Sequence, residues 1–251
     1  MTPAATAPQV RPVSARTALV RILLVADPPT LTSRQICAAT TLVGYPESTI
    51  RVAVSRMVTA GELRRADGTY TLDPARHARR TDLALPTELP WTGDWEQALV
   101  TTTGRSPADR AALRATLLDL RLAELREGVW MRPANLARPW PDTLTTVTPL
   151  RTHPVPDPRA LAARLWDLDS WSTRATALLT ALRTPDPTDR FAAACAVIEH
   201  LRTDPVLPES LQPPAWPAAP LRRVCTDYLD WFATTLGHPF HPPGNTRLPA
   251  D

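Results

Sequence analysis

Residues 45–71, YPESTIRVAVSRMVTAGELRRADGTYT, constrain the fold of this chain more than any other stretch, because they join a short helix to a small basic hairpin. Pro46 and Glu47 are typical of a helix start, since proline pre-sets the φ angle and an acidic group suits the free amides of a first turn. Gly61 suits the left-handed position that ends a helix. The Asp-Gly pair at residues 67–68 favours a tight turn between two strands. The segment therefore predicts a helix, a stop and a hairpin.

The predicted helix has an apolar side and a mostly polar side. Apolar residues recur at helical spacing and are expected to pack inward; they are Ile50, Val54, Met57 and Val58. The opposite side is short and cationic, and two arginines follow it on the hairpin. These outward positions are the candidates for contact with nucleic acid, and they are Ser48, Thr49, Arg51, Val52, Ser55, Arg56, Arg64 and Arg65.

Two further helices are predicted upstream. Leu19, Ile22 and Leu23 repeat at helical spacing, and Thr32 with Gln35 has the form of a capping box before another helix. Three helices and a hairpin are typical of a winged helix-turn-helix domain that binds DNA. Two other interpretations stay open: a winged helix that serves as a protein-contact module, and a small α+β domain whose arginines only solvate it.

Charge is distributed unevenly along the chain. Residues 11–80 hold 11 arginines against 5 acidic residues, a net charge of +6, whereas residues 81–251 hold 17 arginines against 20 acidic residues, a net charge of −3. A locally basic module is the electrostatic pattern expected for contact with the phosphates of double-stranded DNA. The distribution therefore favours the DNA-binding interpretation.

Composition sets limits on the class of protein. A chain of 251 residues with 43% hydrophobic content can bury more than one core. No apolar run approaches the ~20 residues that cross a bilayer, and the N-terminus lacks a secretory pattern, so we expect a cytoplasmic protein without membrane contact. The 3 cysteines and 5 histidines are scattered, which predicts neither a disulfide framework nor a metal site.

Motifs of catalysis and cofactor binding are absent from the sequence. There is no glycine-rich phosphate loop, no nucleophile elbow and no paired metal-ligand spacing. Asp94, Glu96 and Asp109 are the acidic residues that a metal-dependent nuclease would use on such a sheet, but their spacing does not match a metal site. We therefore predict that the protein is not an enzyme and has no resident cofactor.

The rest of the chain mixes strand and helix signals and then becomes helical. Strands at 95–103, 122–125, 129–132 and 143–148, with a helix after Ser106, predict a small ferredoxin-like sheet, while Pro139 and Pro141 forbid a long second helix. The fold class is thus multidomain α+β, with a winged helix-turn-helix domain, a ferredoxin-like middle domain and an α-helical C-terminal domain. The expected divisions are a disordered tail at 1–13, the winged helix-turn-helix at 14–75, a linker at 76–90, the middle domain at 91–152, the helical domain at 153–237 and a flexible Pro-rich tail at 238–251.

Four stretches resemble one family, and they follow its order along nearly the whole chain. They are ESTIRVAVSRMVTAGEL at 47–63, Trp91 with Trp95, GVWMRPAN at 128–135 and LRTDPVLPESLQPPAWP at 201–217. The family is that of the PaaX-type transcriptional repressors, named for control of phenylacetate catabolism. The resemblance implies transcription regulation by a homodimer that leaves operator DNA when it binds phenylacetyl-CoA or another acyl-CoA. It also implies that Arg51, Ser55 and Arg56 contact DNA, because they match the family's DNA-contact positions.

The chain departs from the family in two places. The hairpin RRADGTYTL is short, and ALVTTTGRSPAD replaces a strand that is usually rich in large apolar residues. Because of the second departure, the alternative of a DNA-binding protein that does not respond to a ligand stays open. If an acyl-CoA does bind, Arg132 beside Trp130 is the candidate for contact with it, because arginines bind phosphates and an apolar pocket binds an acyl group. A tryptophan between Val129 and Met131 near a strand end is more typical of a core or domain-interface position than of a ligand contact.

Overall fold

The computed structural model describes a mixed α/β chain over residues 10–26, 28–73, 87–102, 104–142, 144–154 and 157–237. The tails and linker expected at 1–13, 76–90 and 238–251 lie wholly or largely outside these ranges. By contacts, the chain groups into two compact units. The first holds Met1–Leu85, Ala175–Glu199 and Pro220–Asp251, and the second holds Pro86–Arg174 and His200–Ala219. The division into three domains stays a prediction.

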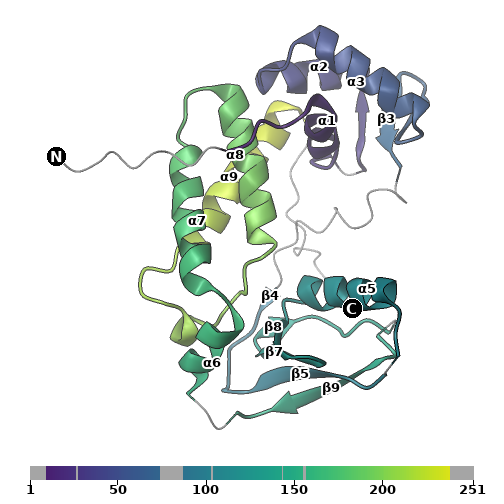
Figure 1. Cartoon of the computed structure of the whole chain (residues 1–251). Coiled ribbons are helices and arrows are strands. Elements are labelled where there is room, and N and C mark those ends of the chain that lie inside the picture. The colour runs from purple at the N-terminus through teal and green to yellow at the C-terminus, as the bar shows by residue number, and fades with distance from the viewer. Residues whose placement is uncertain are drawn as a thin grey trace, which may run out of the picture. The chain divides into compact units, whose positions relative to one another are not determined.

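The N-terminal part of the first unit contains three helices and a three-stranded antiparallel sheet (Figure 1). In chain order the elements are α1 (Ala15–Leu23), β1 (Thr30–Thr32), α2 (Ser33–Leu42), α3 (Glu47–Thr59), β2 (Leu63–Ala66) and β3 (Thr69–Leu72). The sheet order is β1-β3-β2. The three predicted helices and the hairpin are confirmed, whereas β1 is an addition.

Local signals account for these boundaries. The Ser14 hydroxyl accepts a hydrogen bond from the backbone N–H of Thr17 at 3.2 Å and so caps α1. Thr32 and Gln35 form the predicted capping box of α2. In the hairpin, Asp67 and Gly68 have φ angles of 47° and 75°, the pair of positive values that a type I′ turn requires.

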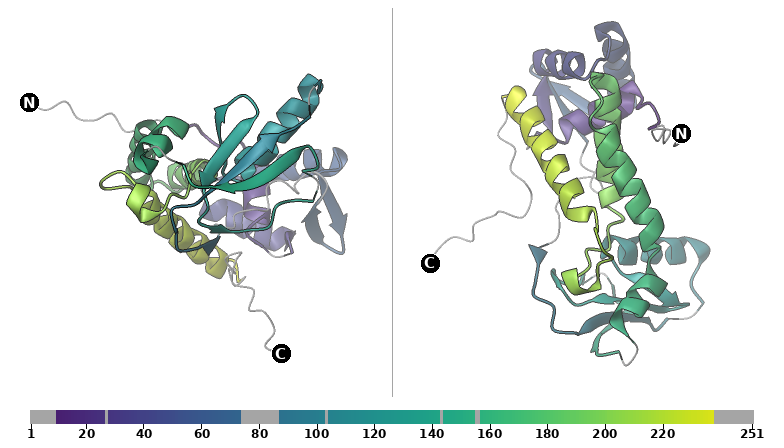
Figure 2. Two further views of the ribbon diagram at one scale, coloured as in Figure 1. Left: turned by 90° about the horizontal axis from the view of Figure 1, so that it is seen from below. Right: turned by 90° about the vertical axis from the view of Figure 1, so that its left-hand side faces the viewer.

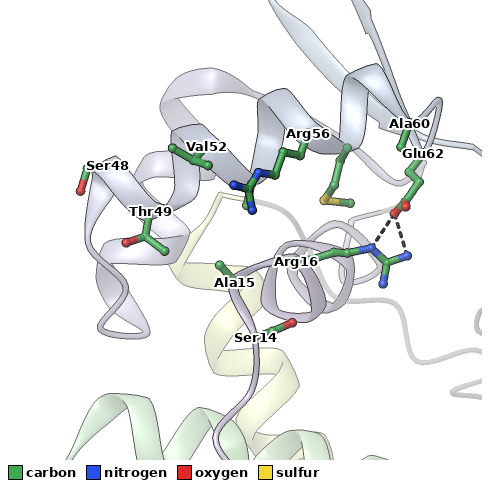
Figure 3. A pocket seen from close by; sticks show the side chains of 11 residues that line it. Ser14, Ala15, Arg16, Ser48, Thr49, Val52, Arg56, Ala60 and Glu62 are labelled. Carbon is green, nitrogen blue, oxygen red and sulfur yellow. Dashed lines mark hydrogen bonds and ion pairs between the residues drawn. The ribbon is translucent and has the colours of Figure 1, made fainter.

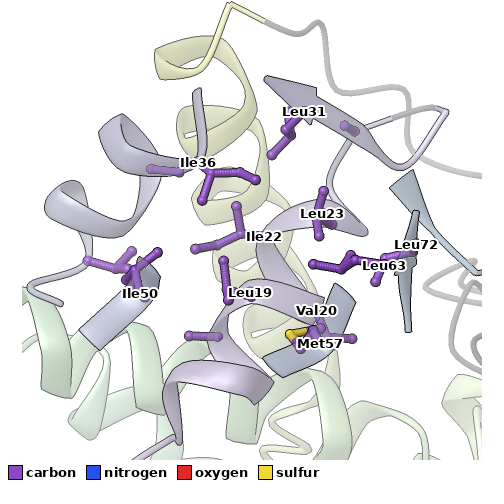
Figure 4. Close-up of a cluster of buried hydrophobic side chains, with 14 of the residues drawn as sticks. Leu19, Val20, Ile22, Leu23, Leu31, Ile36, Ile50, Met57, Leu63 and Leu72 are labelled. Atoms are coloured by element: carbon purple, nitrogen blue, oxygen red, sulfur yellow. The ribbon is translucent and has the colours of Figure 1, made fainter. Parts of the chain in front are cut away.

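The core of the first unit extends beyond these elements. Side chains from α1, α2, α3 and the sheet converge in one apolar cluster (Figure 4). Phe191 and Cys195 of α8 (Pro187–Leu201) and Phe232 of α9 (Ala218–Thr235) belong to the same cluster. Arg21 of α1 also forms an ion pair with Glu199 of α8. Each buried apolar side chain is worth about 1.5–3 kcal/mol, so α8 and α9 are part of what holds the N-terminal helices in place.

The second unit contains a four-stranded antiparallel sheet in the order β6-β7-β5-β9. Its strands are β5 (Trp95–Val100), β6 (Ala123–Arg126), β7 (Val129–Pro133) and β9 (Val147–Thr152). Helix α5 (Pro107–Asp119) covers one face of this sheet (Figures 1 and 2). A short ladder joins β4 (Thr87–Glu88) to β8 (Leu136–Ala137). The strand-helix-strand-strand order that the sequence predicts is confirmed.

The last strand lies later than predicted. The expected strand at 143–148 instead runs over Val147–Thr152, and residue 143 lies outside the described ranges. The difference has a physical reason, because β9 is an edge strand and pairs with β5 alone. An edge strand tolerates a proline, so β9 passes through Pro149, at which a pattern-based assignment stops.

The last part of the chain is helical, as the sequence predicts. Its helices are α6 (Pro158–Leu165), α7 (Leu168–Ala181) and the α8 and α9 already given, with a short 3-10 turn at Glu209–Leu211. Among the apolar side chains of α9, Leu221, Leu229 and Phe232 are buried, whereas Val224 is 37% exposed. Trp216, from the proline-rich loop, stacks on Trp171 at 4.5 Å between ring centroids. No helix within the described ranges is long and apolar enough to cross a bilayer.

Candidate nucleic-acid interface

Helix α3 presents one side to the core and the other to solvent. Ile50 and Met57 are buried, while Val54 and Val58 are half-buried at its margins. All eight candidate residues are exposed: Ser48, Thr49, Arg51, Val52, Ser55, Arg56, Arg64 and Arg65. The division into inner and outer sides therefore agrees with the sequence pattern.

The turn between α2 and α3 fixes where α3 points. Gly44 has a φ of +80°, and a Cβ added there would lie 2.1 Å from Oγ1 of Thr188 in α8. Next to it, the Tyr45 hydroxyl donates to the carbonyl oxygen of Val13 at 2.6 Å, and the Tyr45 ring meets Phe191 edge-on at 6.3 Å. The turn is thus held on both sides by packing that leaves no room for a side chain at position 44.

A hollow of about 670 Å³ lies between α1 and α3. Ser48, Thr49, Val52 and Arg56 line it from α3 (Figure 3). At one edge, Nε of Arg16 donates to Oε2 of Glu62 at 2.8 Å. The Arg56 side chain reaches over the hollow from α3 (Figure 3) and has no ion-pair partner among the described residues. Its guanidinium is therefore available to an anion from outside.

A second hollow, of about 450 Å³, lies on the other flank of α3. It is bounded by α2, α3 and the hairpin, and Arg51, Ser55 and Arg65 line it together. The guanidinium of Arg65 sits over the ring of Tyr70, 5.8 Å from its centroid. Arg64 lines neither of these two hollows. The candidates are thus gathered around α3 in two groups rather than one.

Arg51 carries a partner of its own. Its Nε donates to Oε1 of Glu47, one turn earlier on α3, at 3.0 Å. Exposed pairs at this spacing stabilise a helix by only about 0.3–0.5 kcal/mol. The charge of Arg51 is therefore partly neutralised in the free protein. Because the pair is weak, Arg51 can exchange Glu47 for a stronger acceptor at little cost in free energy.

The sequence interpretation missed two exposed arginines. Arg16 and Arg34 each occupy the second position of a helix, after the caps of α1 and α2. A cation in the first turn opposes the helix dipole, so its presence there needs another reason. For Arg16 the ion pair with Glu62 supplies that reason, so the conflict with the dipole is a signal of phosphate contact for Arg34 alone.

Trp130, one of the two effector candidates, lies in the second unit. It is buried against Leu117 and Val147, and the guanidinium of Arg114 lies 5.2 Å from its ring centroid. It also lines a hollow of about 570 Å³ together with Trp166. Core packing is therefore its observed role, and contact with an effector stays a prediction.

Arg132, the other effector candidate, is 0% exposed and does not line that hollow. Its Nη2 donates to Oδ1 of Asn135 at 2.7 Å, and its Nε lies 3.3 Å from Oε1 of Glu96. Burial lowers the pKa of Arg132 to about 9, so the guanidinium stays charged at neutral pH. The predicted effector site beside Trp130 is therefore buried at Arg132, and the guanidinium there is already bound by Asn135 and Glu96.

Comparison with known proteins relates the chain to a solved structure. No protein-family model matches the chain, and no curated protein does. The solved structure of the uncharacterized protein Rv0674 from Mycobacterium tuberculosis has 38% sequence identity and a TM-score of 0.75, over 89% of this chain and 97% of that one. The chain therefore belongs to the same family as the uncharacterized protein Rv0674 from Mycobacterium tuberculosis.

Proposed function

We propose that this protein is a sequence-specific regulator of transcription that binds double-stranded operator DNA through α3. The observation that carries the proposal is the exposed polar and cationic side of α3, flanked by one hollow under Arg56 and another lined by Arg51 and Arg65. Basic side chains on one side of a helix, next to a basic hairpin, supply both groove reading and phosphate contact.

The arrangement of elements supports assigning two fold types. In the first unit, the helix-strand-helix-helix-hairpin order with sheet order β1-β3-β2 fits a winged helix-turn-helix, with the hairpin as its wing. In the second unit, the antiparallel order β6-β7-β5-β9 fits a ferredoxin-like sheet whose second helix is replaced by irregular chain. Together with the motif resemblance, these orders favour a PaaX-type repressor.

The proposed mechanism requires two copies of the chain. A cytoplasmic homodimer places two α3 helices in successive major grooves of a partly palindromic operator and blocks transcription there. An acyl-CoA effector, such as phenylacetyl-CoA, releases the operator by binding more tightly to a second dimer geometry. The alternative is a regulator that binds DNA in the same way but does not respond to a ligand. The segment ALVTTTGRSPAD, which departs from the family pattern, is the reason to keep this alternative.

Fluorescence anisotropy on labelled DNA from upstream of its own gene tests the proposal. We expect tighter binding than to a scrambled duplex, and weaker binding when phenylacetyl-CoA is added. Arg56→Ala should cost about 1–3 kcal/mol if Arg56 reads a guanine, or weaken all duplexes alike if it holds a phosphate. Arg164→Ala, which removes an exposed arginine from α6, is the matched control.

Equal binding by the Arg56→Ala and Arg164→Ala proteins would remove Arg56 from the interface. Binding that the thioester leaves unchanged would keep the regulator and discard that effector. Operator binding would be refuted if the protein bound neither the upstream DNA nor duplexes selected from a random pool more tightly than the scrambled duplex.

A protein-contact module is the second candidate, and Val52 favours it. This apolar side chain is 51% exposed and faces the hollow between α1 and α3, where an apolar group of a partner protein would fit. Reversing the charge at Arg51 and Arg56 separates the two functions. The contact module keeps its partner after Arg51→Glu and Arg56→Glu, whereas the regulator loses its DNA.

A further inference from the structure

Glu47 and Arg51 form a small unit on the first turns of α3. Both Nε and Nη2 of Arg51 donate to one oxygen, Oε1 of Glu47, and Sγ of Cys37 lies 3.9 Å from that same oxygen. Within the part of the chain that the structure describes, Oε2 of Glu47 and Nη1 of Arg51 have no hydrogen-bond partner. The side chains are 53% and 76% exposed. The pair therefore offers outward one free acceptor beside three remaining N–H donors.

This set of groups complements one base pair in particular. In the major groove, a G·C pair presents two acceptors on guanine, N7 and O6, beside one donor, the N4 amino group of cytosine. We propose that Arg51 donates to the guanine while Oε2 of Glu47 accepts from the cytosine of the same pair, so that the two residues read a G·C base pair as a unit. This inference rests on the proposed DNA-binding function.

Position on the helix supports a shared base pair. Glu47 is the first residue of α3 and Arg51 follows one turn later on the same side. The N-terminal residues of a recognition helix are those that approach base edges. Because the two side chains already touch, they reach one base pair together instead of separate ones.

Glu47 contributes discrimination rather than affinity. A carboxylate that enters a groove lined by phosphates is repelled, unless it accepts a hydrogen bond from a base. At an A·T pair, thymine O4 would face the carboxylate with a second acceptor, and the adenine amino group would face the guanidinium with a second donor. Both mismatches penalise the wrong pair, which is how a repulsive group creates specificity.

Selection from randomised duplexes with the full chain, followed by anisotropy, tests the inference. We expect an enriched half-site with an invariant G·C pair, and about a tenfold or greater loss of affinity when that pair becomes A·T. Glu47→Gln should shrink this ratio severalfold and should bind unselected DNA more tightly than the parent protein does. Arg51→Ala should lose the preference at the same base pair.

Glu124→Gln is the matched control, because Glu124 also pairs with an exposed arginine, Arg114, but in the second unit. It adds the same net charge and should leave the base preference intact. A Glu47→Gln protein that binds its selected duplex with an unchanged preference at every base pair overturns the inference while the regulator stands. Enrichment of no sequence by the parent protein overturns both.

Discussion

The guanidinium of Arg132 is a fully buried charge of the second unit. Glu96 lies between two arginines, with Oε1 3.3 Å from Nε of Arg132 and Oε2 3.1 Å from Nη2 of Arg138. Burial raises the pKa of Glu96, and the two arginines oppose that rise. The two arginines thus offset part of the cost of burying the Glu96 carboxylate.

We expect Arg132→Ala to lower the free energy of unfolding by about 3–5 kcal/mol, because it leaves a buried carboxylate with one partner fewer. Denaturant titration followed by circular dichroism measures the loss. Arg114→Ala breaks the exposed pair with Glu124 and should cost less than about 1 kcal/mol. Equal losses in the two variants would mean that Arg132 is not held as the structure shows.

Side-chain spacing in the sequence reveals part of the residue-scale detail. The outward residues of α3 follow from helical periodicity, and the pairing of Glu47 with Arg51 is the ordinary consequence of a spacing of four. The burial of Arg132 does not follow from its neighbours in sequence. Its partners include the carbonyl oxygen of Val206, over seventy residues away, which no local pattern encodes.

At the scale of elements, the turn before α3 tolerates little change at Gly44. Gly44 combines a positive φ with a close approach to Thr188, whereas Gly61, at the other end of α3, has a φ of +68° and nothing within 4 Å of its added Cβ. The two glycines therefore separate the cost of backbone strain from the cost of a collision.

We expect Gly61→Ala to cost about 1–2 kcal/mol, the price of a left-handed backbone for a residue with a side chain. Gly44→Ala should cost more, because it adds the contact with Thr188. Thermal unfolding of the two variants gives the comparison, and Gly44→Ala combined with Thr188→Ser tests whether the threonine methyl group blocks adjustment. A smaller loss at Gly44 than at Gly61 would contradict the packing described for this turn.

Elements that carry their own start and stop signals are the ones that the sequence predicts well. Helix α2 has a capping box and the hairpin has an Asp-Gly turn, so each is specified locally. Strand β1 has three residues and depends on β3 for its pairing, and β9 crosses a proline because only one of its edges needs hydrogen bonds. These strands are set by their neighbours, which a single segment does not reveal.

At the scale of the whole molecule, pH is expected to act through His200. Its ring stacks on Trp171 with 4.5 Å between centroids, and its Nε2 lies 3.0 Å from the carbonyl oxygen of Trp171. Burial, with a further contribution from Arg174, holds the pKa of His200 below its ordinary value, against the opposing effects of that hydrogen bond and of Asp204. The folded chain therefore resists protonation more than the unfolded chain does.

We expect stability from this group to be present above about pH 6.5 and to fall as the pH drops toward the lower pKa of the folded state, since the unfolded chain then binds more protons. Unfolding curves from pH 7.5 to 5, compared with those of His200→Gln, isolate the effect. The parent protein should lose more stability than the variant over this range. Parallel curves would show that His200 titrates alike in both states.

The sharing of one core by α1, α3, α8 and α9 has a consequence for biosynthesis. Ribosomes add about 5–20 residues per second, so Phe232 emerges roughly 10–30 s after the hairpin that follows α3. During that interval the nascent chain exposes apolar side chains that chaperones and proteases recognise. The first helices to be translated therefore reach their final packing only after α9 has emerged, and the orientation of α3 is settled no earlier than that.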